Sequence, residues 1–173
     1  MEEQAAPEAA WRVTIGAPVR WFRRLASQTQ DRLIGVALAG PSLTVLGLAA
    51  WLTPDPNGVG THQQLGLGGC TILTMFGVPC PMCGMTTTFT HLAHFHALEG
   101  ALNQPFGVVL FLSTVAAAAL GLADIVRPGG RWRRALAIVE RHETAIAIGL
   151  LFGMIGGWGW KWAAMSGALP FLP

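Results

Sequence analysis

Charged residues are scarce in this sequence, and tyrosine is absent. Charged side chains make up 12% of the 173 residues and apolar ones 52%, whereas an average soluble domain is ~25% charged. No charged residue occurs between Pro56 and Leu98. This composition excludes an ordinary soluble domain and leaves no room for a large soluble catalytic domain. We therefore predict an all-α integral membrane protein.

Lysine is nearly missing as well. Lys161 is the one lysine, and the arginines form two clusters that border apolar stretches. The first cluster holds Arg12, Arg20, Arg23, Arg24 and Arg32, and the second holds Arg127, Arg131, Arg133, Arg134 and Arg141. Because the cytoplasmic flanks of membrane helices carry the excess of arginine and lysine, both clusters should be cytoplasmic. We interpret them as topology signals, so we expect no nucleic-acid partner.

Three predominantly apolar stretches have roughly the 20 residues that a helix needs to cross a bilayer. We predict spans at about 33–52, 106–125 and 144–164. The chain starts with acidic rather than basic residues, so we expect the first span to be retained and not cleaved as a signal. Residues 1–32 then form a cytoplasmic basic segment, and residues 33–173 form a single membrane domain in the lipid bilayer.

The segment between the first two spans, residues 53–105, must begin and end on the outer side if both arginine clusters are cytoplasmic. Two further crossings would need roughly 40 residues of regular apolar helix. Glycine and proline interrupt the segment instead, at Gly66, Gly68, Gly69, Gly77, Pro79, Pro81 and Gly84. We therefore predict three transmembrane helices plus a re-entrant or interfacial helical element, whose backbone needs protein packing or a ligand to be satisfied.

Regular helix is expected to resume after the sequence CPMCG. A helix should run from about Met85 to Leu102 and end at Asn103 and Gln104. Pro105 suits the first position of the next helix, because proline has no N–H to donate there.

The last predicted span carries Gly149, Gly153 and Gly157 at a spacing of four. Such a small-residue face permits close approach of another helix, so we expect other membrane proteins as partners. Tryptophans and the lysine follow, at Trp158, Trp160, Lys161 and Trp162. We interpret them as an aromatic belt at the membrane interface, with a lysine that snorkels to the headgroups.

Three cysteines, Cys70, Cys80 and Cys83, lie in the uncharged stretch, and the last two form a Cys-Pro-x-Cys-Gly turn typical of metal knuckles. Structural zinc takes four ligands. The fourth could be His62, eight residues before Cys70, or His91, eight residues after Cys83. The sequence thus allows a Cys3His zinc site and leaves the fourth ligand open.

The same thiols allow a redox role. Cys80 and Cys83 precede an expected helix start, where free amides and the helix dipole favour a thiolate. The outer side of the membrane is oxidising, so these two cysteines could also form a disulfide and leave Cys70 unpaired. The sequence offers no second cysteine pair to pass electrons onward.

Three stretches, DPNGVGTHQQLGLGGC, GVPCPMCGMTTTF and LNQPFGVVL, together resemble a bacterial membrane family known as domain of unknown function 2752. The resemblance covers about residues 55–115 and centres on a Cys-Pro-x-Cys-Gly-x-Thr signature before a long apolar helix. Many members have an arginine after the first threonine of that signature, where this chain has Thr87. The resemblance implies the topology and the bacterial cytoplasmic (inner) membrane, and it carries no activity.

Two functions are consistent with these residues. In the favoured one, the chain is a small non-catalytic multi-pass membrane protein, an accessory or structural subunit of a membrane complex, whose Cys motif is closed by metal or disulfide at the outer face. In the alternative, it is a membrane thiol-disulfide oxidoreductase or metal-handling protein that uses Cys80 and Cys83. In both, the N-terminus is cytoplasmic, and the Cys motif and C-terminus are extracytoplasmic.

Overall fold

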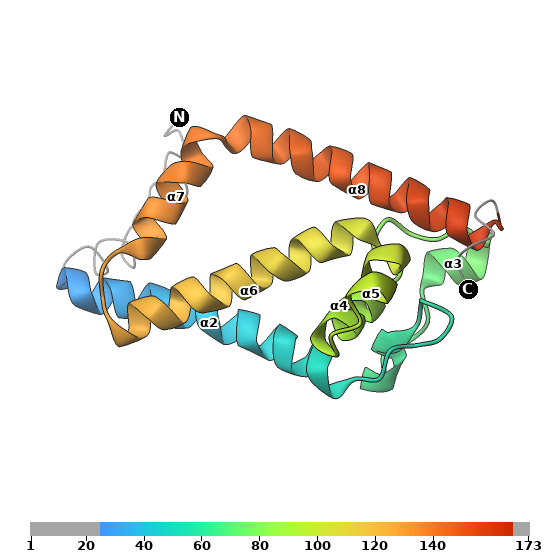
Figure 1. The fold of residues 1–173 in the computed structure, drawn as a ribbon, viewed down its shortest axis with the longest axis horizontal. Helices are drawn as coiled ribbons and strands as arrows, with labels where there is room; N and C mark the ends of the chain where they lie inside the picture. Colours follow the sequence, from blue (N-terminus) through green and yellow to red (C-terminus); the bar gives the residue numbers. More distant parts are fainter. Residues whose placement is uncertain (1–24, 168–173) are drawn as a thin grey trace, which may run out of the picture.

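The computed structural model describes residues 25–167, whose helices are arranged as Figure 1 shows. The long helices are α2 (Ser27–Trp51), α6 (Pro105–Val126) and α8 (Glu143–Met165). The short elements are the 3-10 helix η1 (Thr61–Leu65) and the helices α3 (Thr71–Phe76), α4 (Met85–Ala93), α5 (Ala97–Asn103) and α7 (Arg131–Arg141). No strand occurs in the described residues, so the all-helical fold class is confirmed. Residues 1–24 of the predicted cytoplasmic segment 1–32 lie outside the described residues.

Two of the described helices, α2 and α6, are long and apolar enough to cross a membrane. They cover nearly all of the first two predicted spans, 33–52 and 106–125, and they lie side by side (Figure 1). The third predicted span, 144–164, falls within α8. Helix α8 is 23 residues long, but it is not among the described helices that are also apolar enough to cross a membrane. Its crossing of the membrane therefore stays a prediction.

Helices α2 and α6 touch through small residues. A Cβ added at Gly121 of α6 would lie 2.6 Å from the carbonyl oxygen of Gly35 and 3.0 Å from the Cβ of Ala39, both in α2. All three residues are buried. Small residues let two backbones approach closely, and this favours helix association in lipid. This contact between α2 and α6 was not predicted, because the predicted small-residue face lies on the last span.

Two buried carboxylates fix the start of α7, which links the end of α6 to the start of α8 (Figure 1). Asp124 accepts hydrogen bonds from the backbone N–H groups of Arg131 (3.2 Å) and Trp132 (3.0 Å), and it pairs with the Arg131 guanidinium at 3.2 Å. Asp31, near the start of α2, accepts from Trp132 Nε1 at 2.9 Å and pairs with Arg133 at 3.0 Å. These bonds join the turn between α6 and α7 to the start of α2.

The single helix expected from Met85 to Leu102 is instead broken into α4 and α5. Phe95 lies at the break with φ 64°, a left-handed conformation that is uncommon without glycine. His94 Nε2 lies 3.0 Å from the carbonyl oxygen of Leu52, at the end of α2. The prediction of one helix was wrong. The break could not be recognised in the sequence, because it contains neither glycine nor proline. Pro105 begins α6, as predicted.

Candidate functional site

The CPMCG sequence forms a tight turn between α3 and α4. The backbone N–H of Cys83 donates to the carbonyl of Cys80 over 2.9 Å. Gly84 then adopts φ 82°, a region that side chains rarely tolerate. A Cβ at Gly84 would also lie 2.8 Å from the carbonyl oxygen of Gly58. The glycine of the motif is therefore required both by its own backbone and by the loop that follows α2.

Three side chains hold the carbonyl groups of this turn. Trp158 of α8 donates to the carbonyl of Pro79 over 2.7 Å. Asn103, at the end of α5, donates to the carbonyl of Gly84 over 2.9 Å. Gln104, between α5 and α6, donates to the carbonyl of Pro81 over 3.4 Å. At these carbonyls, protein packing satisfies the backbone, so the turn needs neither a metal nor a disulfide for that purpose.

A pocket of about 240 Å³, which we call the thiol pocket, lies beside the turn. Its lining is rich in sulfur and includes Cys70, Cys80, Cys83, Met82, Met85 and the imidazole of His62. The cysteines are free thiols, and Cys83 is the buried one. Within the described part of the chain, no three His, Cys, Asp or Glu side chains are already arranged to hold a metal ion. Thiol-rich linings of this kind suit soft metals or thiol chemistry.

The three thiols differ in acidity. Hydrogen bonds from the first amides of α3, chiefly that of Leu73, lower the pKa of Cys70, and a hydrogen bond with the Cys80 thiol lowers it further. Burial raises the pKa of Cys80, and the same contact with Cys70 adds to the rise. Burial also raises the pKa of Cys83 to about 11. The prediction that the helix start favours thiolates at Cys80 and Cys83 was wrong, because burial outweighs the effect of the helix amides.

The two candidate histidine ligands lie in different places. His62, in η1, lines the thiol pocket, and its Nε2 lies 3.2 Å from the carbonyl oxygen of Gly68. His91, in α4, lines another pocket, and its Nδ1 is buried with no hydrogen-bond partner in the described structure. The structure therefore groups His62, and not His91, with the cysteines.

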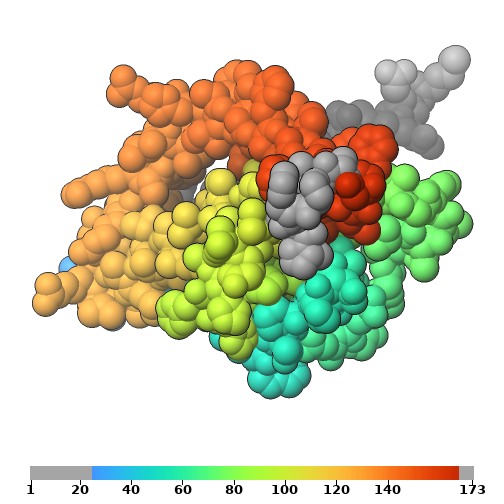
Figure 2. Space-filling view, turned by 45° about the vertical axis from the view of Figure 1, so that its right-hand side comes forward, coloured from blue at the N-terminus to red at the C-terminus, as the bar shows by residue number. Residues whose placement is uncertain are grey.

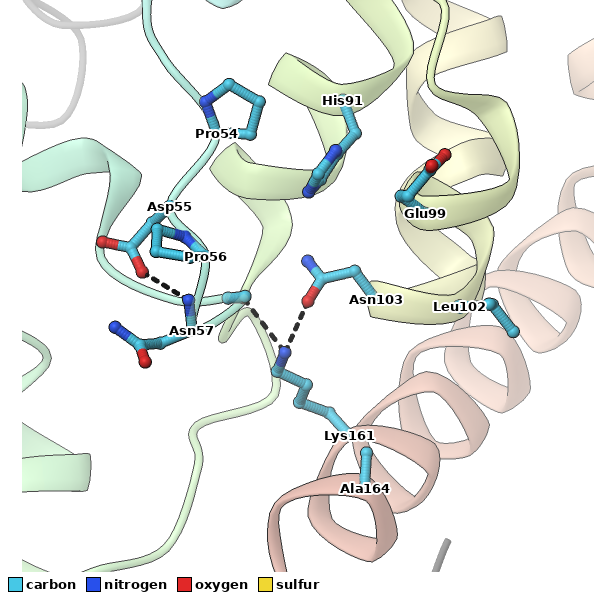
Figure 3. Close-up of a pocket in the computed structure, with 11 residues that line it drawn as sticks. Pro54, Asp55, Pro56, Asn57, His91, Glu99, Leu102, Asn103, Lys161 and Ala164 are labelled. Atoms are coloured by element: carbon cyan, nitrogen blue, oxygen red, sulfur yellow. Dashed lines mark hydrogen bonds between the residues drawn. The ribbon is translucent and has the colours of Figure 1, made fainter. Parts of the chain in front are cut away.

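The second pocket, of about 190 Å³, lies where α2 ends and α6 begins, and we call it the lysine pocket. Lys161 enters it from α8 and points toward Asn103 (Figure 3). Its Nζ donates to the Gly58 carbonyl over 3.0 Å and to Asn103 Oδ1 over 2.6 Å. Lys161 is only 4% exposed. The expectation of a snorkelling lysine was wrong, because the ammonium points inward to the Gly58 carbonyl and Asn103 Oδ1 and not outward to the headgroups.

Two tryptophans of the expected belt also turn inward. Trp160 Nε1 donates to the carbonyl of Leu102 over 2.7 Å, and Trp158 holds the turn as described above. Trp162 remains more than half exposed and stacks on Trp158 with a ring-centroid distance of 6.3 Å. The end of α8 therefore docks on the Cys element through indole N–H groups, and only Trp162 keeps the exposure expected of a belt residue.

Buried polar side chains around Asn103 and Thr87 form contacts that were not predicted from the sequence. The Asn103 amide donates to Thr88 Oγ1 over 3.0 Å as well as to the turn. The hydroxyls of Thr87 and Thr61 lie 2.8 Å apart, and both residues are buried. The available signal was the amide and hydroxyl side chains in an uncharged apolar stretch, because such groups need partners when buried.

Comparison with known proteins places a family match on this part of the chain. Residues 70–118 match the model of a family described as Protein of unknown function (DUF2752). This segment is similar to a domain of unknown function. It contains all three cysteines, α3, the CPMCG turn, α4, α5 and α6 up to residue 118, whereas His62 lies before it. Neither the curated proteins nor the solved structures include a match to the chain.

Proposed function

We propose that this chain is a small non-catalytic multi-pass membrane protein, an accessory or structural subunit of a membrane complex, whose Cys element is closed by zinc at the outer membrane face. The observation that carries the proposal is that Cys70, Cys80 and Cys83 line one pocket with His62. Three cysteines and one histidine are a known ligand set for structural zinc. Zinc would draw their side chains together from the arrangement described.

The zinc would have a structural task at α3. No residue of α3 is buried, and Met75 and Phe76 are 71% and 72% exposed. Figure 2 shows this green segment projecting from the side of the molecule. So little packing implies low local stability. Because Cys70 precedes α3 and Cys80 follows it, a metal bound to both would close the loop and restrain the helix.

The apolar surface of α3 supports its placement at a membrane face. Exposed Ile72, Met75 and Phe76 would contact lipid there and not water. In Figure 1, α3 lies near the end of the molecule where α2 and α8 finish. The arginine clusters support three spans with the N-terminus in the cytoplasm and the Cys element and C-terminus outside, in a bacterial inner membrane.

The glycine face of α8 offers part of a partner surface. A Cβ added at Gly153 or Gly157 would lie 2.8 Å from atoms of Phe106, so these two glycines already pack within the chain. A Cβ at Gly149 would meet nothing within 4 Å. We therefore assign contact with another membrane protein to the part of α8 around Gly149.

Metal analysis of full-length protein purified in detergent tests the proposal. We expect one zinc per chain, lost in Cys80→Ser and Cys83→Ser and nearly so in Cys70→Ser. His62→Ala should weaken metal binding, and His91→Ala is the matched control that should not. A chain that retains no zinc after expression in zinc-replete medium, and shows no thiolate-to-cobalt absorption on titration with Co²⁺, would contradict a metal-closed element.

A second candidate is thiol-disulfide exchange, the alternative that uses Cys80 and Cys83. The Cys80 thiol interacts with the thiols of both Cys70 and Cys83, so either could be its partner. We write the reaction for Cys70, because its pKa is the one that is lowered. The Cys70 thiolate would attack a substrate disulfide, forming a mixed disulfide and releasing one substrate thiolate. Cys80, on losing its proton, would then attack Cys70, forming the Cys70–Cys80 disulfide and releasing the second thiolate. A metal-free chain with two rapidly exchanging thiols, as stable reduced as oxidised, would favour this candidate.

A further inference from the structure

The lysine pocket contains a buried positive charge without a carboxylate partner. An ammonium group has three N–H donors, and the described residues supply two acceptors to Lys161, the Gly58 carbonyl and Asn103 Oδ1. Neither ion pair of the described chain includes Lys161. Lys161 therefore keeps one N–H donor without an acceptor among the described residues, and burying a charged group without a direct ionic partner is costly.

Two further polar groups line the same cavity. His91 has a buried Nδ1 that makes no hydrogen bond in the described structure, and the exposed carboxylate of Glu99 forms no ion pair there. Figure 3 shows His91 and Glu99 on the side of the cavity opposite Lys161. Asp55 also lines the cavity, and its Oδ1 accepts from the backbone N–H of Asn57 over 2.9 Å. No hydrogen bond or ion pair holds the carboxylate of Glu99 in the described structure, so Glu99 is the carboxylate we assign to a ligand.

The size and position of the cavity fit a small molecule. Its volume of about 190 Å³ is several times the roughly 30 Å³ that one water molecule occupies in the liquid. Leu102 and Ala164 give it an apolar wall. Its lining includes residues that directly follow α2 and residues that directly precede α6, so the cavity lies beside the end of α2 and the start of α6. If these two helices cross the membrane, as the proposed function requires, the cavity lies at the depth of the lipid headgroups.

We propose that the lysine pocket binds a small zwitterion, with its anionic oxygen group on Lys161 and its ammonium on Glu99. A simple anion is a poorer fit, because two carboxylates line the cavity, and a metal cation is a poorer fit because of the Lys161 ammonium. The phosphoethanolamine headgroup of a membrane lipid and a free phosphoethanolamine-like molecule carry the same chemistry. The lipid source rests on the proposed function, because it requires that α2 and α6 cross the membrane.

The test uses full-length protein stripped of lipid in detergent, with tryptophan fluorescence as the readout. The probes are O-phosphoethanolamine, inorganic phosphate, and short-chain phosphatidylethanolamine and phosphatidylcholine of equal acyl length. Phosphatidylcholine is the matched control, because its quaternary ammonium cannot donate a hydrogen bond to Glu99. Glu99→Gln should weaken binding of the ethanolamine probes by about tenfold or more, since it removes one charge-assisted hydrogen bond. Glu143→Gln, at an exposed acid at the other end of α8, should leave binding unchanged.

Each outcome decides a part of the proposal. Tighter binding of phosphatidylethanolamine than of both phosphatidylcholine and O-phosphoethanolamine supports the lipid source, and equal binding of free and lipid-borne phosphoethanolamine supports the free one. Phosphate binding as tight as that of O-phosphoethanolamine and insensitive to Glu99→Gln would overturn the zwitterion, and binding of no probe would overturn the site. Lys161→Met should abolish binding. If Lys161→Met does not fold, Glu99→Gln still tests the proposal, because Glu99 is exposed. Zinc content measured on the same samples reports on the proposed function separately.

Discussion

Lys161 Nζ lies 2.6 Å from Asn103 Oδ1 and 3.0 Å from the carbonyl oxygen of Gly58. One ammonium group thereby joins the last turns of α8 to the end of α5 and to the loop after α2. Asn103 passes the connection on, because its amide donates to the carbonyl of Gly84 in the cysteine turn. Removal of the charge at Lys161 should therefore loosen the whole Cys element.

Lys161→Met should lower the free energy of unfolding by about 1–3 kcal/mol, because it leaves two buried acceptors without a donor. Thermal unfolding in detergent, followed by tryptophan fluorescence, measures the change. Trp162→Phe is a suitable control on the same helix, since Trp162 is more than half exposed. Equal stability of Lys161→Met and the wild type would show that the ammonium contributes nothing to docking.

Gly121→Ala should destabilise the crossing of α2 and α6. Its Cβ would lie 2.6 Å from the backbone oxygen of Gly35, which cannot move away like a flexible side chain. We expect a loss of about 1–3 kcal/mol, as for other overpacked contacts. The matched control is Gly47→Ala in α2, where an added Cβ meets nothing within 4 Å. Indistinguishable unfolding of the two variants would mean that the helices separate more easily than their contact implies.

Gly153→Leu and Gly149→Leu separate packing within the chain from packing against a partner. A side chain at Gly153 meets the Phe106 ring, so this variant should be less stable as an isolated chain. Gly149→Leu should leave the isolated chain intact and reduce recovery of its partner complex after mild solubilisation. Membrane insertion should be normal in both. Partner recovery that survives Gly149→Leu would remove α8 around Gly149 from the interface.

The stability of the metal-free protein should fall as the pH rises from about 9 to about 11. Burial raises the pKa of Cys83 from its ordinary value of 9.0 to about 11. The folded state thus holds the thiol proton over a range in which the unfolded chain has released it, and this favours unfolding. The loss is at most about 3 kcal/mol, at 1.36 kcal/mol per pKa unit. Cys83→Ala, followed by chemical denaturation at several pH values, should lack this component.

Alkylation of the same metal-free protein gives an independent measure of thiol acidity. Cys70 should react first at neutral pH and Cys83 last, because only the thiolate is the nucleophile. Mass spectrometry of peptides at short reaction times reads the order, with denatured protein as the control for equal reactivity. Fastest labelling of Cys83 in the folded protein would contradict the described burial of this thiol.

Topology reporters test the proposed orientation. A reporter within residues 55–62 or after Pro173 should be extracytoplasmic, and one within residues 128–140 should be cytoplasmic. The contact between Gly58 and Lys161 requires the loop after α2 and the end of α8 to lie at the same end of the molecule. Opposite sidedness for residue 60 and Pro173 would refute three spans. Pro173 itself lies outside the described residues.

The sequence by itself determined the all-helical class of the protein and, apart from the start of α2, the positions of its long helices. Scarce charge and long apolar stretches suffice for this, because an apolar stretch of this length satisfies its backbone hydrogen bonds locally as a helix. The predicted boundaries at Pro105 and near residues 144–164 agree with α6 and α8 to within about one residue. The predicted ligands Cys70, Cys80, Cys83 and His62 also line one pocket.

Tertiary structure alone decided how the polar groups are used. The break at Phe95, the inward turn of Lys161 and the close contact of Gly35 with Gly121 all depend on residues distant in sequence. No local pattern encodes them, since the partner that makes an unusual conformation or a buried charge tolerable comes from another helix. The division of His62 and His91 between two pockets has the same origin: equal spacing from the cysteines along the chain does not fix equal distance in space.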